Sequence, residues 1–338
     1  MNERQAILQA NLGEYLQQVS GGPAGVSHMQ PLAGGASRET WAVTANLAGR
    51  EEHLVLRLDM ASSMNAAAIS RADEFRLLQV AYEQGVRCPR PRWLCTDPAV
   101  LGAPFFLMDL VAGESIGTRV VRRPELATAR AALPAQMAAQ LAHIHAIDPA
   151  TPGLTFLPRP PAGTSPAQHI INQMRQALAD LQSASPGLTA GLRWLEQHQP
   201  PAGALRVLHG DFRVGNLLVV PAGLAAVIDW EFAHLGDPLE DIAWPLVRDW
   251  RFGQGHLRLG GISNAEPYLA AYEALTKRPL AREAVTYWEI MGNMKWAVTC
   301  LVQAQRHISG RDPSIELASL GRRSAEMELE LLTLIAGR

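Results

Sequence analysis

Residues 208–244 read LHGDFRVGNLLVVPAGLAAVIDWEFAHLGDPLEDIAW. Asp211 is followed five residues later by Asn216, and Asp229 stands beyond two short apolar runs. Phosphoryl transfer to an alcohol needs an Asp to accept the hydroxyl proton, an Asn to hold a metal, and a second Asp to bridge Mg²⁺ to nucleotide phosphates. The order of these side chains therefore predicts that two carboxylates and an amide meet at one cleft.

The two apolar runs between Asn216 and Asp229 predict a hairpin. Residues 217–220 and 224–228 are rich in aliphatic side chains and flank Pro-Ala-Gly at 221–223, a sequence typical of a tight turn. We expect the hairpin to bring Asn216 and Asp229 together. Arg213, two residues after Asp211, is placed where a cation can reach the phosphoryl group in transfer.

The same stretch has a plainer interpretation as a loop between strands, because Asp, Gly and Asn are turn formers. Within it, His209 is expected to bond nearby backbone rather than to act as a base. Asp237 is expected to cap a helix N-terminus. We expect Asp241 to brace the catalytic loop from below.

The motif HGDFRVGN, followed by IDWE and GDPLEDIAW, resembles the aminoglycoside phosphotransferase-like family, a branch of the protein-kinase-like fold. Within that family, WRFG and NMKWAV are similar to stretches of kinase-like domains that occur alone in bacteria or fused to acyl-CoA dehydrogenases. The resemblance implies Asp211 as catalytic base and Arg213 in the place of the kinase catalytic-loop lysine. It also implies Asn216 and Asp229 as ligands of Mg²⁺, with ATP as the phosphoryl donor.

Length and composition limit the classes of partner. The chain of 338 residues allows two lobes, which we place at residues 1–111, covering the nucleotide, and 112–338, carrying the catalytic loop and hairpin. A formal net charge of -2 gives no indication of a basic surface that would bind nucleic acid. No apolar run approaches membrane-spanning length, and the N-terminus lacks a signal-peptide core, so a cytoplasmic protein is expected. A homodimer is one assembly that we consider.

The element pattern predicts a small lobe of antiparallel strands with one helix, a short connector, and a mostly helical lobe. This is a two-lobed α+β fold of the protein-kinase-like type. The three cysteines are too few and too widely spaced for a disulfide framework, so free thiols are expected.

In the first lobe, phosphate contacts are expected from a glycine-rich turn and from one arginine. Gly34, Gly35 and Ser37 could cover phosphates with backbone N–H groups, although a plain hairpin turn is the alternative. The chain holds only two lysines, Lys277 and Lys295, so a cation for phosphate in the first half must be arginine.

The strand HLVLRLD at 53–59 supplies that arginine, Arg57, on the face opposite its leucines. The resembled family usually has lysine at this position, so Arg57 departs from its pattern. Glu74, on a helix expected over 66–84, could pair with Arg57, and Asp73 is the neighbouring alternative. A solvated strand arginine remains the other interpretation of Arg57.

Adenine is expected to meet the end of the next strand and the connector after it. The segment PFFLMDLVAG at 104–113 resembles the hinge between the lobes. The residues assigned to the nucleotide site are Gly34, Gly35, Ser37, Val55, Arg57, Glu74, Met108, Asp109, Leu110 and Val111.

The acceptor is expected to be an anion with an apolar body. Residues 245–262 hold three arginines against one acid, and the assigned substrate residues are Arg248, Trp250, Arg251, Arg258 and Lys295. For Lys295 a snorkelling side chain is the alternative. The sequence thus predicts an ATP-dependent kinase acting on a hydroxy acid or hydroxyacyl-CoA. The alternatives are a non-catalytic nucleotide-binding regulatory module, an aminoglycoside-type antibiotic kinase and a metal-dependent phosphohydrolase.

Overall fold

The computed structural model describes residues 3–32, 39–59 and 68–337, and these form two compact units. The first unit contains Met1–Gly113 and two later segments, Ala150–Leu157 and Ala225–Ala233. The second contains Glu114–Pro149, Pro158–Leu224 and His234–Arg338. Each unit is described by itself.

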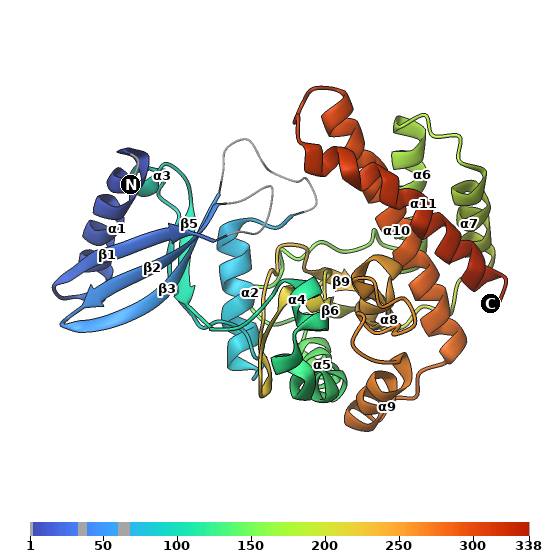
Figure 1. The fold of residues 1–338 in the computed structure, drawn as a ribbon, viewed down its shortest axis with the longest axis horizontal. Helices are drawn as coiled ribbons and strands as arrows, with labels where there is room; N and C mark the ends of the chain where they lie inside the picture. The colour runs from blue at the N-terminus through green and yellow to red at the C-terminus, as the bar shows by residue number, and fades with distance from the viewer. Residues whose placement is uncertain (1–2, 33–38, 60–67, 338) are drawn as a thin grey trace. The chain divides into compact units, whose positions relative to one another are not determined.

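The first unit is built on a five-stranded antiparallel sheet with the strand order β1-β2-β3-β5-β4 (Figure 1). In β3 the register pairs Leu56 with Trp41 of β2 on one side and with Leu107 of β5 on the other. The strands and helices of this unit are α1 (Glu3–Ser20), β1 (Ala24–Pro31), β2 (Glu39–Leu47), β3 (Arg50–Leu58), α2 (Arg71–Glu83), β4 (Pro91–Cys95), α3 (Pro98–Leu101) and β5 (Phe105–Asp109).

Helix α1 packs its apolar stripe against one face of the sheet. Leu8, Leu12 and Leu16, at helical spacing, form one core with Leu54 and Leu56 of β3. The alternation along β3 therefore buries its leucines under α1 and turns the intervening residues to the opposite face.

Helix α2 contacts the opposite face of the sheet, where the Phe75 and Phe106 rings lie 5.8 Å apart. It begins at Arg71, because the Ser70 hydroxyl caps it by accepting from the Asp73 N–H. The sequence predicted a start at residue 66; residues 68–70 are not helical, and 66 and 67 lie outside the described residues. The helix places Glu74, which is fully buried, in its first turn.

The second unit is mostly helical, and its largest core surrounds α10. Ile290, Met294 and Ala297 form a buried stripe against which the partly buried Leu301 packs, and helices α6, α7 and α11 lie beside it (Figure 1). The helices of this unit are α4 (Gly117–Arg122), α5 (Ala127–Ala146), α6 (Pro166–Asp180), α7 (Pro186–Gln197), α8 (Pro238–Ala243), α9 (Ala265–Thr276), α10 (Arg282–Ile308) and α11 (Ile315–Ile335), with short 3₁₀ turns η1 (Pro124–Leu126), η2 (Val214–Asn216), η3 (Trp244–Leu246) and η4 (Arg248–Arg251).

Short strands frame the segment quoted above. β6 (Arg206–Leu208) pairs antiparallel with β9 (His234–Gly236), while β7 (Leu217–Val220) and β8 (Gly223–Val227) form a two-stranded sheet. The predicted hairpin is thereby confirmed, with the strands within one residue of their expected bounds. The chain passes from the second unit into the first within β8.

The three cysteines are free and buried. Within residues 3–32, 39–59 and 68–337, no helix is long and apolar enough to cross a membrane.

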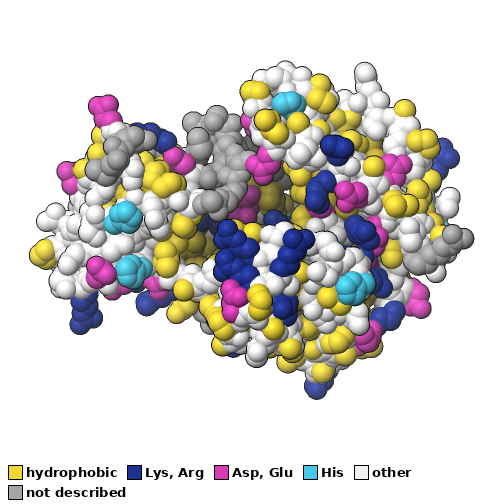
Figure 2. Space-filling view, in the orientation of Figure 1, with side chains coloured by type: hydrophobic (Ala, Val, Ile, Leu, Met, Phe, Trp, Pro, Cys, Tyr) yellow, Lys and Arg dark blue, Asp and Glu magenta, His cyan; other side chains and the backbone are white. Residues whose placement is uncertain are grey.

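On the face shown in Figure 2, Lys and Arg side chains gather near α4. Glu114 Oε2 lies 3.6 Å from Arg119 Nη1 and 3.4 Å from Arg123 Nη1, so this carboxylate partly neutralises the two arginines.

Candidate active site

The loop that carries Asp211 is held in place by the carboxylate of Asp241 in α8. The Asp241 carboxylate accepts from the backbone N–H groups of His209 at 2.7 Å and Gly210 at 2.9 Å, and its Oδ2 lies 3.3 Å from His145 Nε2. Gly210 has a φ of 80°, a left-handed conformation that favours glycine. The predicted bracing role of Asp241 is confirmed by these contacts.

The pKa of Asp241 shows why this brace stays charged. Burial raises the pKa of its carboxyl, but the hydrogen bond and positive charge of His145 and the bonds from the loop outweigh burial and hold the pKa below its usual range. Asp237, as predicted, caps α8 by accepting from the Leu239 N–H at 2.9 Å. His209 Nδ1 accepts from the Asp211 N–H at 3.2 Å, which confirms its structural role.

The Asp211 carboxylate receives three side-chain donors. Its Oδ1 accepts from Trp244 Nε1 at 2.6 Å and from Arg213 Nε at 3.0 Å, and its Oδ2 accepts from Asn216 Nδ2 at 2.6 Å. Asn216 Nδ2 also donates to the Asp211 carbonyl oxygen at 2.9 Å. The carboxylate is therefore fixed in orientation while its side chain keeps 13% exposure.

Two contacts hold the Arg213 side chain: its Nε donates to Asp211, and one face of its guanidinium lies against Trp250. Its guanidinium carbon lies 4.5 Å from the centroid of the Trp250 ring, a cation–π contact. A Cβ on residue 215 would collide with Arg213 Nη1, so Gly215 leaves the space that this side chain occupies. Two of the residues predicted for different roles, Arg213 and Trp250, are thus in direct contact.

Asn216 and Asp229 are the predicted Mg²⁺ ligands, and their chemistry fits that ion. Because Asn216 Nδ2 donates to Asp211, the amide oxygen is turned away from that carboxylate and can serve a cation. Asp229 adopts a φ of 69°, an uncommon conformation for a non-glycine residue. Mg²⁺ is usually held by one or two protein oxygen ligands together with substrate phosphates, so the amide and the carboxylate are each a suitable kind of ligand. Among the described residues, no group of three or more His, Cys, Asp and Glu side chains forms an all-protein metal site.

Arg57 lies in an acidic cluster of the first unit. Its Nη1 lies 2.8 Å from Glu74 Oε1 and its Nη2 lies 2.9 Å from Asp229 Oδ1, with Glu231 Oε2 at 3.9 Å. Burial lowers the pKa of Arg57, but these carboxylates outweigh it and raise the pKa well above its usual range. The predicted pairing with Glu74 is confirmed. The alternative of a solvated strand arginine is wrong, because Arg57 is 8% exposed.

The other residues assigned to the nucleotide lie on β3, β5 and the connector. Val55 and Met108 are register partners, and each is 7% exposed. The Asp109 N–H donates to the Arg90 carbonyl and the Leu110 N–H donates to the His53 carbonyl, both at 2.9 Å. These two N–H groups are therefore used within the protein, and the assignment of this segment to the adenine stays a prediction. Gly34, Gly35 and Ser37 lie outside the described residues.

The arginines of residues 245–262, which were expected to receive an anionic acceptor, are paired with carboxylates of the protein. Arg251, 4% exposed, lies 2.7 Å from Glu330 and 3.1 Å from Glu289, and Arg258 also pairs with Glu289. Arg248 lies 3.4 Å from Glu330. These acids come from α10 and α11, so a count of charges along the segment could not include them. The arginines stabilise the packing of η4 against those helices.

Lys295 and Trp250 also have protein partners. Lys295 Nζ donates to Glu240 Oε1 at 2.9 Å and lies 5.3 Å from the centroid of the Trp244 ring. Burial lowers the pKa of Lys295, but Glu240 offsets burial and raises the pKa. The pair is anchored to α8, so Lys295 is not a snorkelling side chain. Trp244 and Glu240 were not predicted as site residues, although both lie in GDPLEDIAW.

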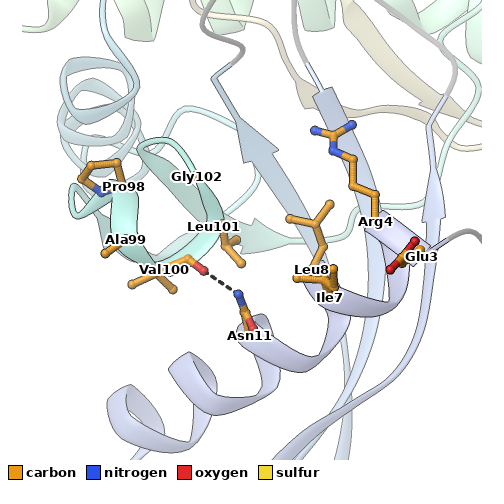
Figure 3. A pocket seen from close by; sticks show the side chains of 10 residues that line it. All are labelled: Glu3, Arg4, Ile7, Leu8, Asn11, Pro98, Ala99, Val100, Leu101 and Gly102. Carbon is orange, nitrogen blue, oxygen red and sulfur yellow. Dashed lines mark hydrogen bonds between the residues drawn. The ribbon is translucent and has the colours of Figure 1, made fainter.

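A pocket of ≈ 470 Å³ lies elsewhere in the first unit, between α1 and α3 (Figure 3). Ile7, Leu8 and Val100 contribute apolar surface, and Asn11 Nδ2 donates to the Val100 carbonyl at 3.1 Å. None of its lining residues is a predicted site residue, so it carries no part of the proposed chemistry.

Comparisons with known proteins agree with this geometry. A model of the phosphotransferase enzyme family matches residues 28–282. A candidate aminoglycoside phosphotransferase of Ralstonia eutropha is 22% identical, with a TM-score of 0.74 over 95% of this chain and 97% of that chain. The aminoglycoside phosphotransferase APH(4)-Ia, in a ternary complex with AMP-PNP and hygromycin B, is 17% identical, with a TM-score of 0.63 over 97% and 100% of the two chains. These likenesses confirm the predicted kinase-like fold.

Curated relatives extend the comparison to longer proteins. Acyl-CoA dehydrogenase family member 10 of Mus musculus is 29% identical over 79% of this chain and 25% of the relative. The probable acyl-CoA dehydrogenase IBR3 of Arabidopsis thaliana is 28% identical over 67% of this chain and 29% of the relative. The chain thus spans about a quarter of the length of these relatives. The resemblance drawn from HGDFRVGN, IDWE and GDPLEDIAW is confirmed.

Proposed function

Because the chain belongs to the phosphotransferase enzyme family, we propose that it transfers the terminal phosphoryl group of ATP to a hydroxyl group of a small molecule. The observation that carries the proposal is the Asp211 carboxylate, which three donors orient while it stays accessible. A general base must keep one acceptor position toward the substrate in a fixed direction. A turn residue in a plain loop would not need three side-chain donors.

In the proposed step the acceptor hydroxyl oxygen attacks the γ-phosphorus and gives its proton to Asp211. A new P–O bond forms, the bond from the γ-phosphorus to the β,γ-bridging oxygen breaks, and ADP leaves with that electron pair. Arg213 donates from Nε to Asp211, which leaves its Nη donors for the oxygens of the phosphoryl group in transfer. Asn216 and Asp229 would hold Mg²⁺, which supplies charge neutralisation to the phosphates when it is bound.

The nucleotide is proposed to use the sheet of the first unit. Arg57, already fixed by Glu74, would grip a phosphate with its guanidinium in place of the usual lysine. Val55 and Met108 offer adjacent apolar side chains to the adenine ring, and Val111 offers its N–H.

For the acceptor we propose a hydroxylated carboxylic acid or its CoA thioester. The support is now the family of the curated relatives, whose names place them among acyl-CoA dehydrogenases. The arginines of residues 245–262 no longer support this choice, because carboxylates of α10 and α11 pair with them. An aminoglycoside, a polycation, would require open carboxylates at the acceptor side.

A second candidate is a module that binds nucleotide without turnover. The observation in its favour is the contact between Arg57 and Asp229, which joins the proposed phosphate ligand to a proposed metal ligand at 2.9 Å. In such a module the ion pair between Arg57 and Asp229 would persist when nucleotide binds, and the bound nucleotide would not be consumed.

ATP depletion, measured with hydroxy acids, hydroxyacyl-CoA thioesters and kanamycin, separates these functions. We expect turnover with the acids or thioesters and none with kanamycin. Asp211→Asn should lower turnover by roughly 10²-fold to 10⁴-fold and leave nucleotide binding intact. Nucleotide binding with no consumption by any acceptor would support the second candidate. Undiminished turnover by Asp211→Asn would remove the assigned base.

A further inference from the structure

We infer that Trp244 is the positioning residue of the Asp211 carboxylate and leaves Oδ2 as the oxygen that receives the acceptor proton. The inference rests on the proposed function, but its central contact is independent of substrate. Trp244 Nε1 donates to Asp211 Oδ1 at 2.6 Å, and the indole is 6% exposed. A short hydrogen bond from a buried donor to a carboxylate is strong and directional.

The choice between the two oxygens follows from how many donors each accepts. A carboxylate offers about four acceptor positions, two on each oxygen. Oδ1 accepts from Trp244 Nε1 at 2.6 Å and Arg213 Nε at 3.0 Å, so both of its positions are used. Oδ2 accepts from Asn216 at 2.6 Å and has only a longer, shared contact with Arg213 Nε at 3.3 Å. Among the described donors, Oδ2 therefore retains the position for a hydroxyl.

Helix α8 and the turn after it hold the loop twice. Asp241 binds the backbone N–H groups of His209 and Gly210, and Trp244, three residues later, binds the side chain of Asp211. Residues three apart on a helical segment lie on the same face, and Trp244 keeps helical dihedrals of -55° and -44°. One helical turn thus fixes both the backbone and the carboxylate of the catalytic loop.

The indole itself has little freedom to move. The Trp250 ring packs against it in a tilted arrangement, with centroids 5.5 Å apart, and Lys295, paired with Glu240, lies 5.3 Å from the centroid of the indole ring. A Cβ on residue 292 would stand 2.7 Å from Val247 Cγ2 and 3.5 Å from Trp244 Cε3, so Gly292 lets Val247 and the indole approach α10 closely. A donor held in this way orients the carboxylate before the substrate binds, which is how precise positioning contributes to rate.

Three variants test the role. Trp244→Phe keeps an aromatic ring and removes the N–H, and we expect it to lower kcat by roughly 10-fold to 100-fold with the KM for ATP unchanged. Trp244→His should recover part of this loss, because its imidazole can place Nε2–H where the indole has Nε1–H. Trp288→Phe is the matched control. Trp288 is 2% exposed, and its Nε1 has no hydrogen-bond partner among the described residues, so kcat should stay within about twofold.

Activity is measured as transfer to the acceptor found in the panel, or as basal Mg²⁺-ATP hydrolysis with water as acceptor. A second readout uses ¹⁵N-labelled tryptophan. The Trp244 indole N–H, assigned by its loss in Trp244→Phe, should resonate far downfield and shift upfield in Asp211→Asn. Melting curves of all variants verify folding.

The outcomes separate the inference from the proposed function. Wild-type kcat in Trp244→Phe, while Asp211→Asn is impaired, would overturn the inference and leave the kinase assignment standing. An unchanged chemical shift of the Trp244 indole N–H in Asp211→Asn would overturn the inference as well. If the wild type neither transfers nor hydrolyses, the proposed function fails, and the NMR result alone still decides whether Trp244 orients Asp211.

Discussion

Arg57→Ala should destabilise the first unit far more than the loss of an ordinary surface arginine. Arg57 is 8% exposed and is the cation that joins the fully buried Glu74 to Asp229. Without it, both carboxylates stay where they are with less positive charge around them. Removal of one partner from a buried ion pair leaves an uncompensated buried charge and costs about 3–5 kcal/mol.

Two features of the cluster place Arg57→Ala at the lower end of that range. Glu74 keeps a second cation, because its Oε2 also pairs with Arg71. The Asp229 side chain is 35% exposed, so water can replace part of what the guanidinium supplied. We therefore expect a loss of about 3 kcal/mol and a correspondingly lower Tm. Arg57→Lys should recover about half, because one ammonium cannot bridge both carboxylates.

Thermal and urea unfolding of the wild type, Arg57→Ala and the matched control Arg92→Ala would test the estimate. Arg92 also lies in the first unit and contacts Asp109 at 2.7 Å, but its side chain is 21% exposed, so its loss should cost about 1 kcal/mol or less. Equal losses for the two alanine variants would refute the buried-cluster reasoning. Mg²⁺-ATP should raise the Tm of the wild type and not of Arg57→Ala. A retained shift would refute the phosphate-binding role.

Other predictions concern the proposed metal ligand Asp229, the carboxylate of Asp241 that binds the loop, and the ion pair between Glu240 and Lys295. Asp229→Asn should weaken nucleotide affinity about 10-fold or more in the presence of Mg²⁺ and little in EDTA, measured by calorimetry. Asp241→Asn should cost about 2–3 kcal/mol in urea unfolding and slow turnover, because two backbone N–H groups lose a charged acceptor. In Glu240, burial raises the pKa, but Lys295 and His234 outweigh it and hold the pKa far below its usual range. That stabilisation exists above about pH 4.3, the unfolded value, and is lost as pH falls toward the folded pKa. The stability difference between the wild type and Glu240→Gln should therefore shrink below about pH 4.

Features that depend on residues close together in the chain were predictable from the sequence. The β7–β8 hairpin follows from two apolar runs around a Pro-Ala-Gly turn, and the Asp237 cap follows from an acid before a proline-initiated helix. The contacts among His209, Asp211 and Asn216 are likewise short-range. In such cases the covalent chain already holds the partners within a few residues, so local geometry decides the bond.

The tertiary structure alone decided which distant groups neutralise or orient the site residues. Arg251 and Arg258 looked like open cations beside one acid, but Glu289 and Glu330 arrive from α10 and α11. Trp244 received no role from the sequence, yet its indole N–H binds a carboxylate 33 positions earlier. Electrostatic and hydrogen-bond energies depend on distance through space, and the spacing of residues in the sequence does not contain that distance. The motif therefore identified the loop that carries the proposed base, whereas packing selected the partners that hold it.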